Sequence, residues 1–168
     1  MQGPKIEETF KGAVVLAEAL NKLSIQTEIL GFNDKLYEYQ RYGQDMNRGV
    51  RDKMGEMLLE VSGIGSYWND DGWALGQASE RLAKQKAKEK FLLVLSDGQP
   101  CPSSTHAGTE YELGSVIKII MNETGQKLIG LGIGPNTNHV KKYYPNNFAN
   151  ISVEEMPDRL AKIIKELI

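Results

Sequence analysis

The stretch KEKFLLVLSDGQP, residues 88–100, decides the fold, because five consecutive apolar residues, Phe91–Leu95, are followed directly by Ser96, Asp97 and Gly98. An apolar run of this length without polar alternation is typical of a strand that is buried on both faces. The Ser-Asp-Gly triplet ends the strand, since Asp and Gly favour turns. The carboxylate of Asp97 is therefore expected where a buried strand reaches the surface.

The composition is that of one soluble globular domain spanning residues 1–168, with 40% apolar and 25% charged residues. A formal net charge of −2 gives no reason to expect a nucleic acid or an anionic membrane as a partner. A single cysteine, Cys101, excludes an intramolecular disulfide and a zinc site built from several cysteines. No apolar run approaches the roughly 20 residues that span a bilayer, and a cytoplasmic location is the default expectation.

The spacing of apolar residues predicts helices that alternate with strands along the chain. Helices are expected over residues 5–22, 48–61, 109–122 and 153–168, with a helical turn over 139–144 and a loop at 66–75 that feeds a helix ending near residue 88. Strands are expected over residues 27–32, 91–95, 127–134 and 148–152, with an edge strand over 36–43. Continuously apolar strands between amphipathic helices predict a doubly wound α/β domain, in which helices cover both faces of a mainly parallel sheet.

Polar side chains gather at the predicted carboxyl ends of these strands, where ligands bind in such sheets. Asn33 and Asp34 follow one strand, Ser96 and Asp97 follow another, and Asn69–Asp71 precede a helix. Their hard oxygen atoms suit Mg²⁺ better than a soft metal. Asp and Asn are equally ordinary turn residues at strand ends, so the pattern alone leaves both interpretations open.

Other chemistries have weaker support in the sequence. The chain contains no GxxxxGK[ST] segment, which disfavours a P-loop, and GLGIG (residues 130–134) lacks the third glycine of a dinucleotide fingerprint. The glycines of that strand are expected to allow close packing of a helix. His106 and His139 are far apart in the sequence, and His106 lies in a polar loop, where we expect it to be solvated.

Three segments together resemble the von Willebrand factor A (vWA) domains of CobT-type cobaltochelatase subunits. LVLSDGQP resembles the strand and (S/T)DG turn of vWA domains, and TEILGFND resembles a second strand of the CobT-type group. NDDGWALGQASERLAKQKAKEKFLLVLSDGQP resembles that group's NxDGxAL helix, which runs into the same SDGxP strand. LIGLGIG, the VKKYYPN turn and the C-terminal helix complete the resemblance, which thus covers nearly the whole chain and implies a vWA, Rossmann-like sheet.

The resemblance also implies a metal-ion-dependent adhesion site (MIDAS) built from three loops. Asp97 would supply the carboxylate of the third loop, and Asp71 with Asn69 would supply the second. The DxSxS motif of the first loop is absent, and MQGPKIEETF resembles the segment that follows it in the family, so an N-terminally truncated domain with weak Mg²⁺ binding is expected. The surrounding partner-binding edge would comprise Asn33, Asp34, Asp70, Ser96 and Gln99.

The function that follows from this resemblance is a non-catalytic protein-interaction module that works with an AAA+ ATPase partner of the CobS type. The alternative is a small α/β enzyme that binds a phosphorylated or nucleotide ligand at the same edge. Its best candidate for a phosphate cradle is GPNTNH, residues 134–139, at a predicted helix start.

In the family, the strand that carries DxSxS lies between the strands that match residues 27–32 and 91–95. Without it, three outcomes are open: direct pairing of these two strands, exchange of a strand between copies to form a homo-oligomer, or an open groove. Direct pairing is the first choice, closely followed by strand exchange, and in both cases neither strand is expected to keep a bare inner edge.

Overall fold

The computed structural model describes residues 4–60, 68–96, 99–156, 158–159 and 161–162. Its helices are α1 (Pro4–Lys22), α2 (Arg48–Gly55), α3 (Met57–Glu60), α4 (Asp71–Ala83), α5 (Leu113–Ile119) and α6 (Val140–Tyr143), with short turns η1 (Ser104–His106), η2 (Thr109–Tyr111) and η3 (Ile120–Thr124). Its strands are β1 (Ile29–Phe32), β2 (Leu36–Gln40), β3 (Phe91–Ser96), β4 (Lys127–Ile133) and β5 (Asn146–Ile151). None of the described helices is both long enough and apolar enough to cross a membrane.

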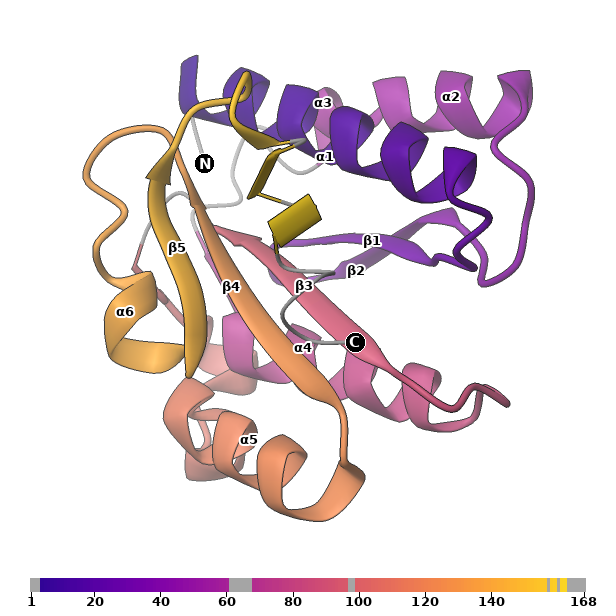
Figure 1. Ribbon diagram of the computed structural model, residues 1–168. Coiled ribbons are helices and arrows are strands. Elements are labelled where there is room, and N and C mark those ends of the chain that lie inside the picture. The colour runs from indigo at the N-terminus through magenta and orange to yellow at the C-terminus, as the bar shows by residue number, and fades with distance from the viewer. Residues whose placement is uncertain (1–3, 61–67, 97–98, 157, 160, 163–168) are drawn as a thin grey trace.

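The centre of the molecule is a parallel sheet of order β3-β4-β5, in which Phe91 pairs with Lys127 and the register continues to Ser96 and Gly132. Leu16 and Leu20 of α1 pack on one face of the sheet, against Ile129, Leu131 and Ile133 of β4. Helices α4 and α5 cover the opposite face (Figure 1). The predicted α/β architecture, with helices on both faces of a parallel sheet, is confirmed.

The glycines of β4 allow one segment to approach the sheet closely. Successive side chains of a strand point to opposite faces, so Gly130 and Gly132 lie on the face opposite Ile129 and Leu131. A Cβ atom on Gly130 would lie 2.4 Å from the ring of Tyr144, which follows α6 directly. The expectation that these glycines permit close packing is confirmed.

The strand expected over residues 27–32 does not join the parallel sheet, and this prediction was wrong. Its ordered part, β1, pairs antiparallel with β2 in a separate two-stranded sheet. Direct pairing with β3, the first of the three outcomes considered, does not occur. The Asn33–Lys35 turn explains the pairing: Asn33 Oδ1 accepts from Lys35 N–H at 2.9 Å, which turns the chain back into a hairpin.

Helix α1 also packs against this hairpin. Ala17 of α1 belongs to a cluster with Tyr39 of β2 and with Val50 and Met54 of α2. One helix therefore contacts both sheets, which places the hairpin beside the parallel sheet without pairing between the strands (Figure 1).

Three helices differ from their predicted extents. The helix expected over 48–61 is divided into α2 and α3 next to Gly55, a poor helix former. Helix α4 begins at Asp71, inside the loop expected over 66–75. It ends at Ala83, because the lysine-rich stretch that follows has little apolar surface to pack on the sheet. Of the predicted helix 153–168, residues 153–155 form a turn, and residues 156, 158–159 and 161–162 are helical. Residues 157, 160 and 163–168 lie outside the described residues.

Candidate functional site

The loops at the carboxyl ends of β1 and β3 meet at the N-terminus of α4. The backbone N–H of Asp70 donates to the carbonyl of Asn33 at 3.2 Å, which joins α4 to the end of β1. Asn69 and Cys101 exchange two backbone hydrogen bonds, of 2.8 and 3.2 Å, which join the same point to the loop after β3. Three segments distant in the sequence thus form one edge, although β1 belongs to the antiparallel hairpin and not to the parallel sheet.

Asp70 is the centre of this edge. It precedes α4, but its side chain does not cap the helix. Its carboxylate instead accepts three hydrogen bonds, from Ser103 N–H (2.5 Å), Ser103 Oγ (2.7 Å) and His106 Nδ1 (2.5 Å). The Asp70 side chain is 0% exposed, so these bonds replace its hydration and fix the loop to α4.

His106 is held in this network and is not solvated, contrary to the expectation for a polar loop. Its side chain is 14% exposed, and its ring stacks on Trp73 with centroids 4.2 Å apart and planes 9° apart. Tyr111 packs edge-on against the other side at 5.6 Å. An ionised carboxylate only accepts hydrogen bonds, so Nδ1 of His106 carries the proton donated to Asp70. Sequence reasoning missed this pair because its members are 36 residues apart.

Asp71 begins α4 and is buried, with an exposed fraction of 4%. The next residue, Gly72, lies against the backbone of Tyr111, since a Cβ atom on Gly72 would be 1.8 Å from the Tyr111 carbonyl oxygen. Only a glycine fits between α4 and η2 at this point. The Asp-Gly pair of the NDDGWAL motif therefore has two roles. Asp71 places a carboxylate at the edge, and Gly72 lets the backbone of α4 contact the backbone of η2.

The remaining predicted edge residues have different environments. Asn33 is buried, and its amide lies within hydrogen-bonding distance of the Tyr37 hydroxyl and the Glu60 carbonyl. Asn69 is half-buried and donates from Nδ2 to the carbonyl of Gln99 at 3.4 Å. Asp34 is half-buried, and the Gln99 side chain is exposed.

A second group of polar residues lies at the ends of β3 and β4. Ser96 Oγ and His139 Nε2 are 2.9 Å apart, and both residues are buried. Thr137, fully buried and near His139 in sequence, accepts a hydrogen bond from Asn150 N–H and donates to the Gly134 carbonyl. The sequence places Ser96 at this edge, but it does not indicate His139 as its partner.

The proposed third-loop carboxylate, Asp97, lies outside the described residues. Asn69, Asp71 and Ser96 are hard oxygen donors of the kind that Mg²⁺ prefers. In the described part of the chain, however, no three His, Cys, Asp or Glu residues converge as a metal centre would require. The described donors therefore fit a divalent cation in kind but do not by themselves complete a site, and Asp70 already accepts three hydrogen bonds.

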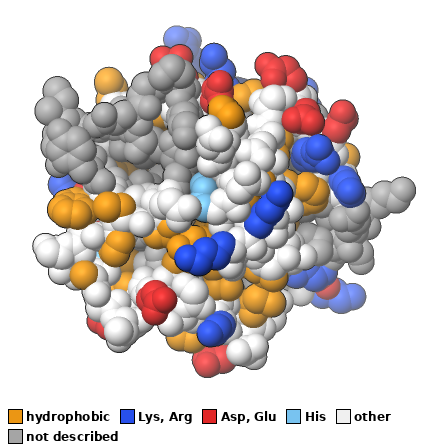
Figure 2. All heavy atoms as spheres, turned by 90° about the vertical axis from the view of Figure 1, so that its left-hand side faces the viewer, with side chains coloured by type: hydrophobic (Ala, Val, Ile, Leu, Met, Phe, Trp, Pro, Cys, Tyr) orange, Lys and Arg blue, Asp and Glu red, His pale blue; other side chains and the backbone are white. Residues whose placement is uncertain are grey.

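The described charged side chains are mixed in sign on the side that carries β5 and α6 (Figure 2). Figure 2 shows acidic and basic side chains interspersed with apolar ones on this side, so no continuous patch of one sign is visible there. A patch of this kind is what non-specific binding to nucleic acid requires.

Comparison with known proteins places this architecture in a family. Residues 45–168 match the family described as "Cobalamin biosynthesis protein CobT VWA domain". The uncharacterized protein YojO of Bacillus subtilis is 26% identical over 104 residues, covering 57% of this chain and 16% of YojO. This chain thus spans less than a fifth of the length of that relative.

One similar solved structure is the crystal structure of an uncharacterized membrane-spanning protein from Vibrio fischeri. It shares 16% identity and covers 90% of this chain and 83% of its own, with a TM-score of 0.33, which is too low to indicate a common fold. The family match instead covers most of the chain, including α4, the parallel sheet and the edge centred on Asp70. The chain belongs to the CobT VWA domain family.

Proposed function

We propose that this chain is a non-catalytic protein-interaction module and that the edge around Asp70 docks an AAA+ ATPase of the CobS type. Membership of the CobT VWA family supports the proposal. The observation that carries it is the Asp70 carboxylate, whose three hydrogen bonds tie Ser103 and His106 to the start of α4 before any partner arrives. A surface ordered in advance loses less entropy when it binds.

The exposed groups at this edge are suited to contact a partner. Trp68, next to the Asn69–Cys101 bridge, is 44% exposed, and tryptophan is among the residues that contribute most to protein interfaces. The two backbone bonds of the bridge restrain the chain on which Trp68 stands. Asp34 and Gln99 would add polar contacts at the rim.

Mg²⁺ at this edge is part of the proposal, with Asp97, Asp71 and Asn69 as the residues that would hold it. When bound, the ion would leave a coordination position that a carboxylate of the partner fills. Because the chain lacks the DxSxS motif, we expect only weak binding of Mg²⁺ or Mn²⁺ to the isolated chain. Titration calorimetry measures this directly, and a dissociation constant in the low micromolar range would contradict the expectation.

The test of the function is a thermal-unfolding series with the purified chain. We expect the melting temperature to rise only when Mg²⁺ and a CobS-type ATPase are both present, and to stay unchanged with ATP or inorganic phosphate alone. Trp68→Ala should remove the rise, whereas Leu59→Ala, at another exposed apolar side chain, should keep it. A rise in melting temperature with nucleotide alone would favour the alternative function, a small α/β enzyme that binds a phosphorylated or nucleotide ligand.

The structure gives no support to the phosphate cradle of that enzyme. In the segment 134–139, the backbone N–H of Thr137 already donates to Asn150 Oδ1 at 3.1 Å, and its side chain is fully buried. The helix that follows, α6, is four residues long, so its N-terminus has little dipole to offer an anion.

A further inference from the structure

A groove lies between α1, α2 and the turn that follows β5. Its volume is about 460 Å³. Its walls are apolar side chains from these three segments: Phe10, Val14, Val15, Met46, Met54 and Val153. Helices α1 and α2 lie side by side, because they share an apolar cluster beneath the groove (Figure 1).

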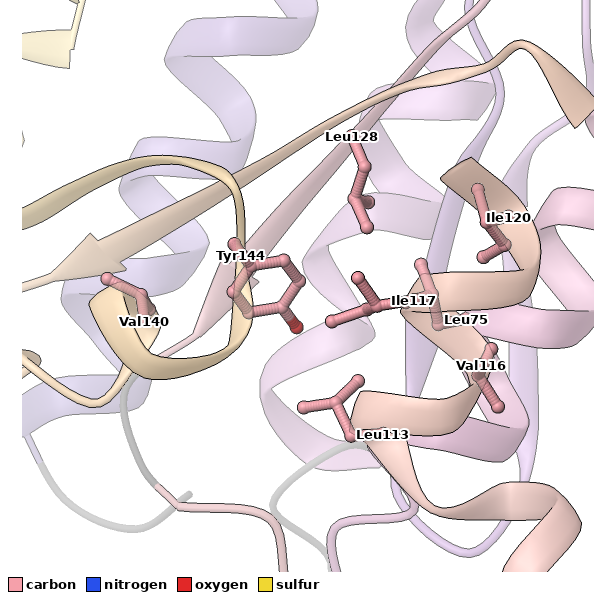
Figure 3. Close-up of a cluster of buried hydrophobic side chains, with 8 residues drawn as sticks. All are labelled: Leu75, Leu113, Val116, Ile117, Ile120, Leu128, Val140 and Tyr144. Atoms are coloured by element: carbon pink, nitrogen blue, oxygen red, sulfur yellow. The ribbon is translucent and has the colours of Figure 1, made fainter. Parts of the chain in front are cut away.

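The groove differs from the apolar packing on the opposite face of the parallel sheet. There, Leu75 of α4, Ile117 of α5 and Leu128 of β4 bury one another (Figure 3). Along the groove, Phe10 and Val14 are only half-buried. A contiguous apolar groove that stays open to solvent is the form that partner-binding sites take.

The shape of the groove favours a helix as its occupant. Phe10, Val14 and Glu18 are four residues apart, as are Lys11 and Val15, so all five line one face of α1 over roughly 12 Å. Pockets for small molecules enclose most of the ligand, which a groove open along one side does not. An amphipathic helix buries only its apolar face in such a groove and keeps its other face in water.

The floor of the groove is suited to such a helix. Met46 and Met54 are buried there, with exposed fractions of 6% and 2%. The methionine side chain is unbranched and adapts its shape to the surface that packs on it. The floor can therefore fit the side chains of an incoming helix without a change in the backbone.

Charged side chains border the groove and indicate the charge of the partner. Arg51 Nε and Nη2 donate to the two carboxylate oxygens of Glu18 at 2.6 and 3.2 Å, so these side chains neutralise each other. Lys11 is exposed and forms no salt bridge with any described residue. The border thus carries one unpaired positive charge, which an acidic side chain would complement.

We propose that this groove binds an amphipathic helix of a partner protein. The apolar face of that helix lies along α1, and an acidic side chain beside this face pairs with Lys11. The groove shares no residue with the edge around Asp70, so it adds a second interface that does not depend on the function proposed for that edge.

The test uses a labelled synthetic helix of about four turns, with leucines every three or four residues on one face and a glutamate beside them. Fluorescence anisotropy measures its binding to the purified chain. We expect saturable binding to wild type and about fivefold weaker binding to Lys11→Glu, the size expected for an exposed ion pair. A peptide with lysine in place of the glutamate should reverse this order and bind Lys11→Glu more tightly.

Lys118→Glu is the matched control, because it makes the same change in net charge at an exposed position on α5. It should bind both peptides as wild type does. A peptide with serines in place of the leucines should bind none of the three proteins. Equal urea midpoints of Lys11→Glu and Lys118→Glu show that the lost binding is not a loss of folding.

The proposal is overturned if the glutamate helix shows no saturable binding to wild type, or if wild type and Lys11→Glu bind both peptides equally. Saturable binding of dodecanoate in place of the helix also overturns it and assigns the groove to a fatty carboxylate. Self-association of wild type that Lys11→Glu abolishes assigns the groove to a second copy of the chain instead. None of these results bears on the edge around Asp70.

Discussion

Gly72 shows how much a single residue contributes to the edge, because it has no room for a side chain. A Cβ atom there would meet the backbone of Tyr111 at 1.8 Å for the oxygen and 2.8 Å for the carbonyl carbon. A backbone cannot move aside as the end of a flexible side chain can. We expect Gly72→Ala to lower the free energy of unfolding by about 3 kcal/mol in urea titrations.

Gly76→Ala, one turn further along α4, is the matched control. The nearest atom to a methyl group at this position would be Val116 Cγ1, at an ordinary contact distance of 3.9 Å. Alanine is the better helix former, so this variant should gain up to about 1 kcal/mol. Equal losses for the two variants would show that the contact with Tyr111 is not what restricts residue 72.

Asp70 leads to a second prediction at the residue scale. In Asp70→Asn, the amide would present a donor to groups that already donate, Ser103 and His106. We expect a loss of about 2 kcal/mol or more in the free energy of unfolding. Asp45→Asn, at an exposed position, should change stability very little, and a neutral Asp70→Asn would contradict the buried network.

At the scale of elements, the hairpin is attached to α4 by an ion-pair network around Arg81. Its guanidinium contacts Glu28 Oε1 at 2.5 Å and also pairs with Glu38 of β2. The side chain of Arg81 is 37% exposed, so water screens part of this attraction. The network orients the hairpin more than it stabilises the molecule.

We expect Arg81→Met to lower the free energy of unfolding by about 1 kcal/mol or less, and the difference from wild type to shrink in high salt. Arg48→Met, which breaks an exposed pair with Asp52, should have no measurable effect. An Arg81→Met loss that salt leaves unchanged would mean that packing of the Arg81 stem, and not charge, holds the hairpin.

The same network makes the folding stability of the domain depend on pH. A hydrogen bond from Arg41, followed by one from Arg81, lowers the pKa of Glu38. A carboxylate whose pKa is lower in the folded state stabilises that state fully above its unfolded pKa, roughly 4.3. This contribution disappears as pH falls through the lower, folded pKa, so urea midpoints of wild type and Arg81→Met should converge in acid.

At the scale of the whole molecule, the outer edge of β3 is the least protected feature. The Lys90 carbonyl accepts from Lys127 N–H, so in this register the even-numbered residues of β3 bond to β4. Phe91, Leu93 and Leu95 direct their N–H and C=O groups to the other side, where no described strand pairs with them. All three side chains are only half-buried, whereas Ile129, Leu131 and Ile133 of β4 are buried.

Among the described strands β1 pairs only with β2 and β3 only with β4, so neither is paired on both sides; the expectation that their free edges are then covered stays a prediction. Strand exchange between copies stays a prediction, because an apolar strand without charges, proline or a bulge is poorly protected against pairing. We expect sedimentation velocity to detect association that increases with protein concentration. A stable monomer at every concentration would contradict strand exchange.

Two proline variants locate that association on β3. Leu93→Pro removes an N–H that points away from β4, so it should suppress association while keeping the sheet. Leu92→Pro removes an N–H that bonds to β4, and it should cost at least about 1 kcal/mol more in the free energy of unfolding. Equal losses of unfolding free energy in the two variants would contradict the assignment of the Leu92 N–H to β4 and of the Leu93 N–H to the free edge.

The sequence by itself determined the features that depend on local pattern. The apolar runs of β3 and β4 identify a parallel sheet, because buried strands need no polar alternation. The sequence also gathers Asn33, Asn69 and Asp70 at one edge, but it does so by assuming a parallel sheet that β1 does not join.

Only the tertiary structure decided which strands pair and which polar groups meet. It placed β1 with β2 and not with β3, joined Asp70 to His106, and joined Ser96 to His139. Each of these depends on packing between segments far apart in the chain. An apolar run or a turn signal records whether a segment is buried or bends, but it does not record which distant surface buries it.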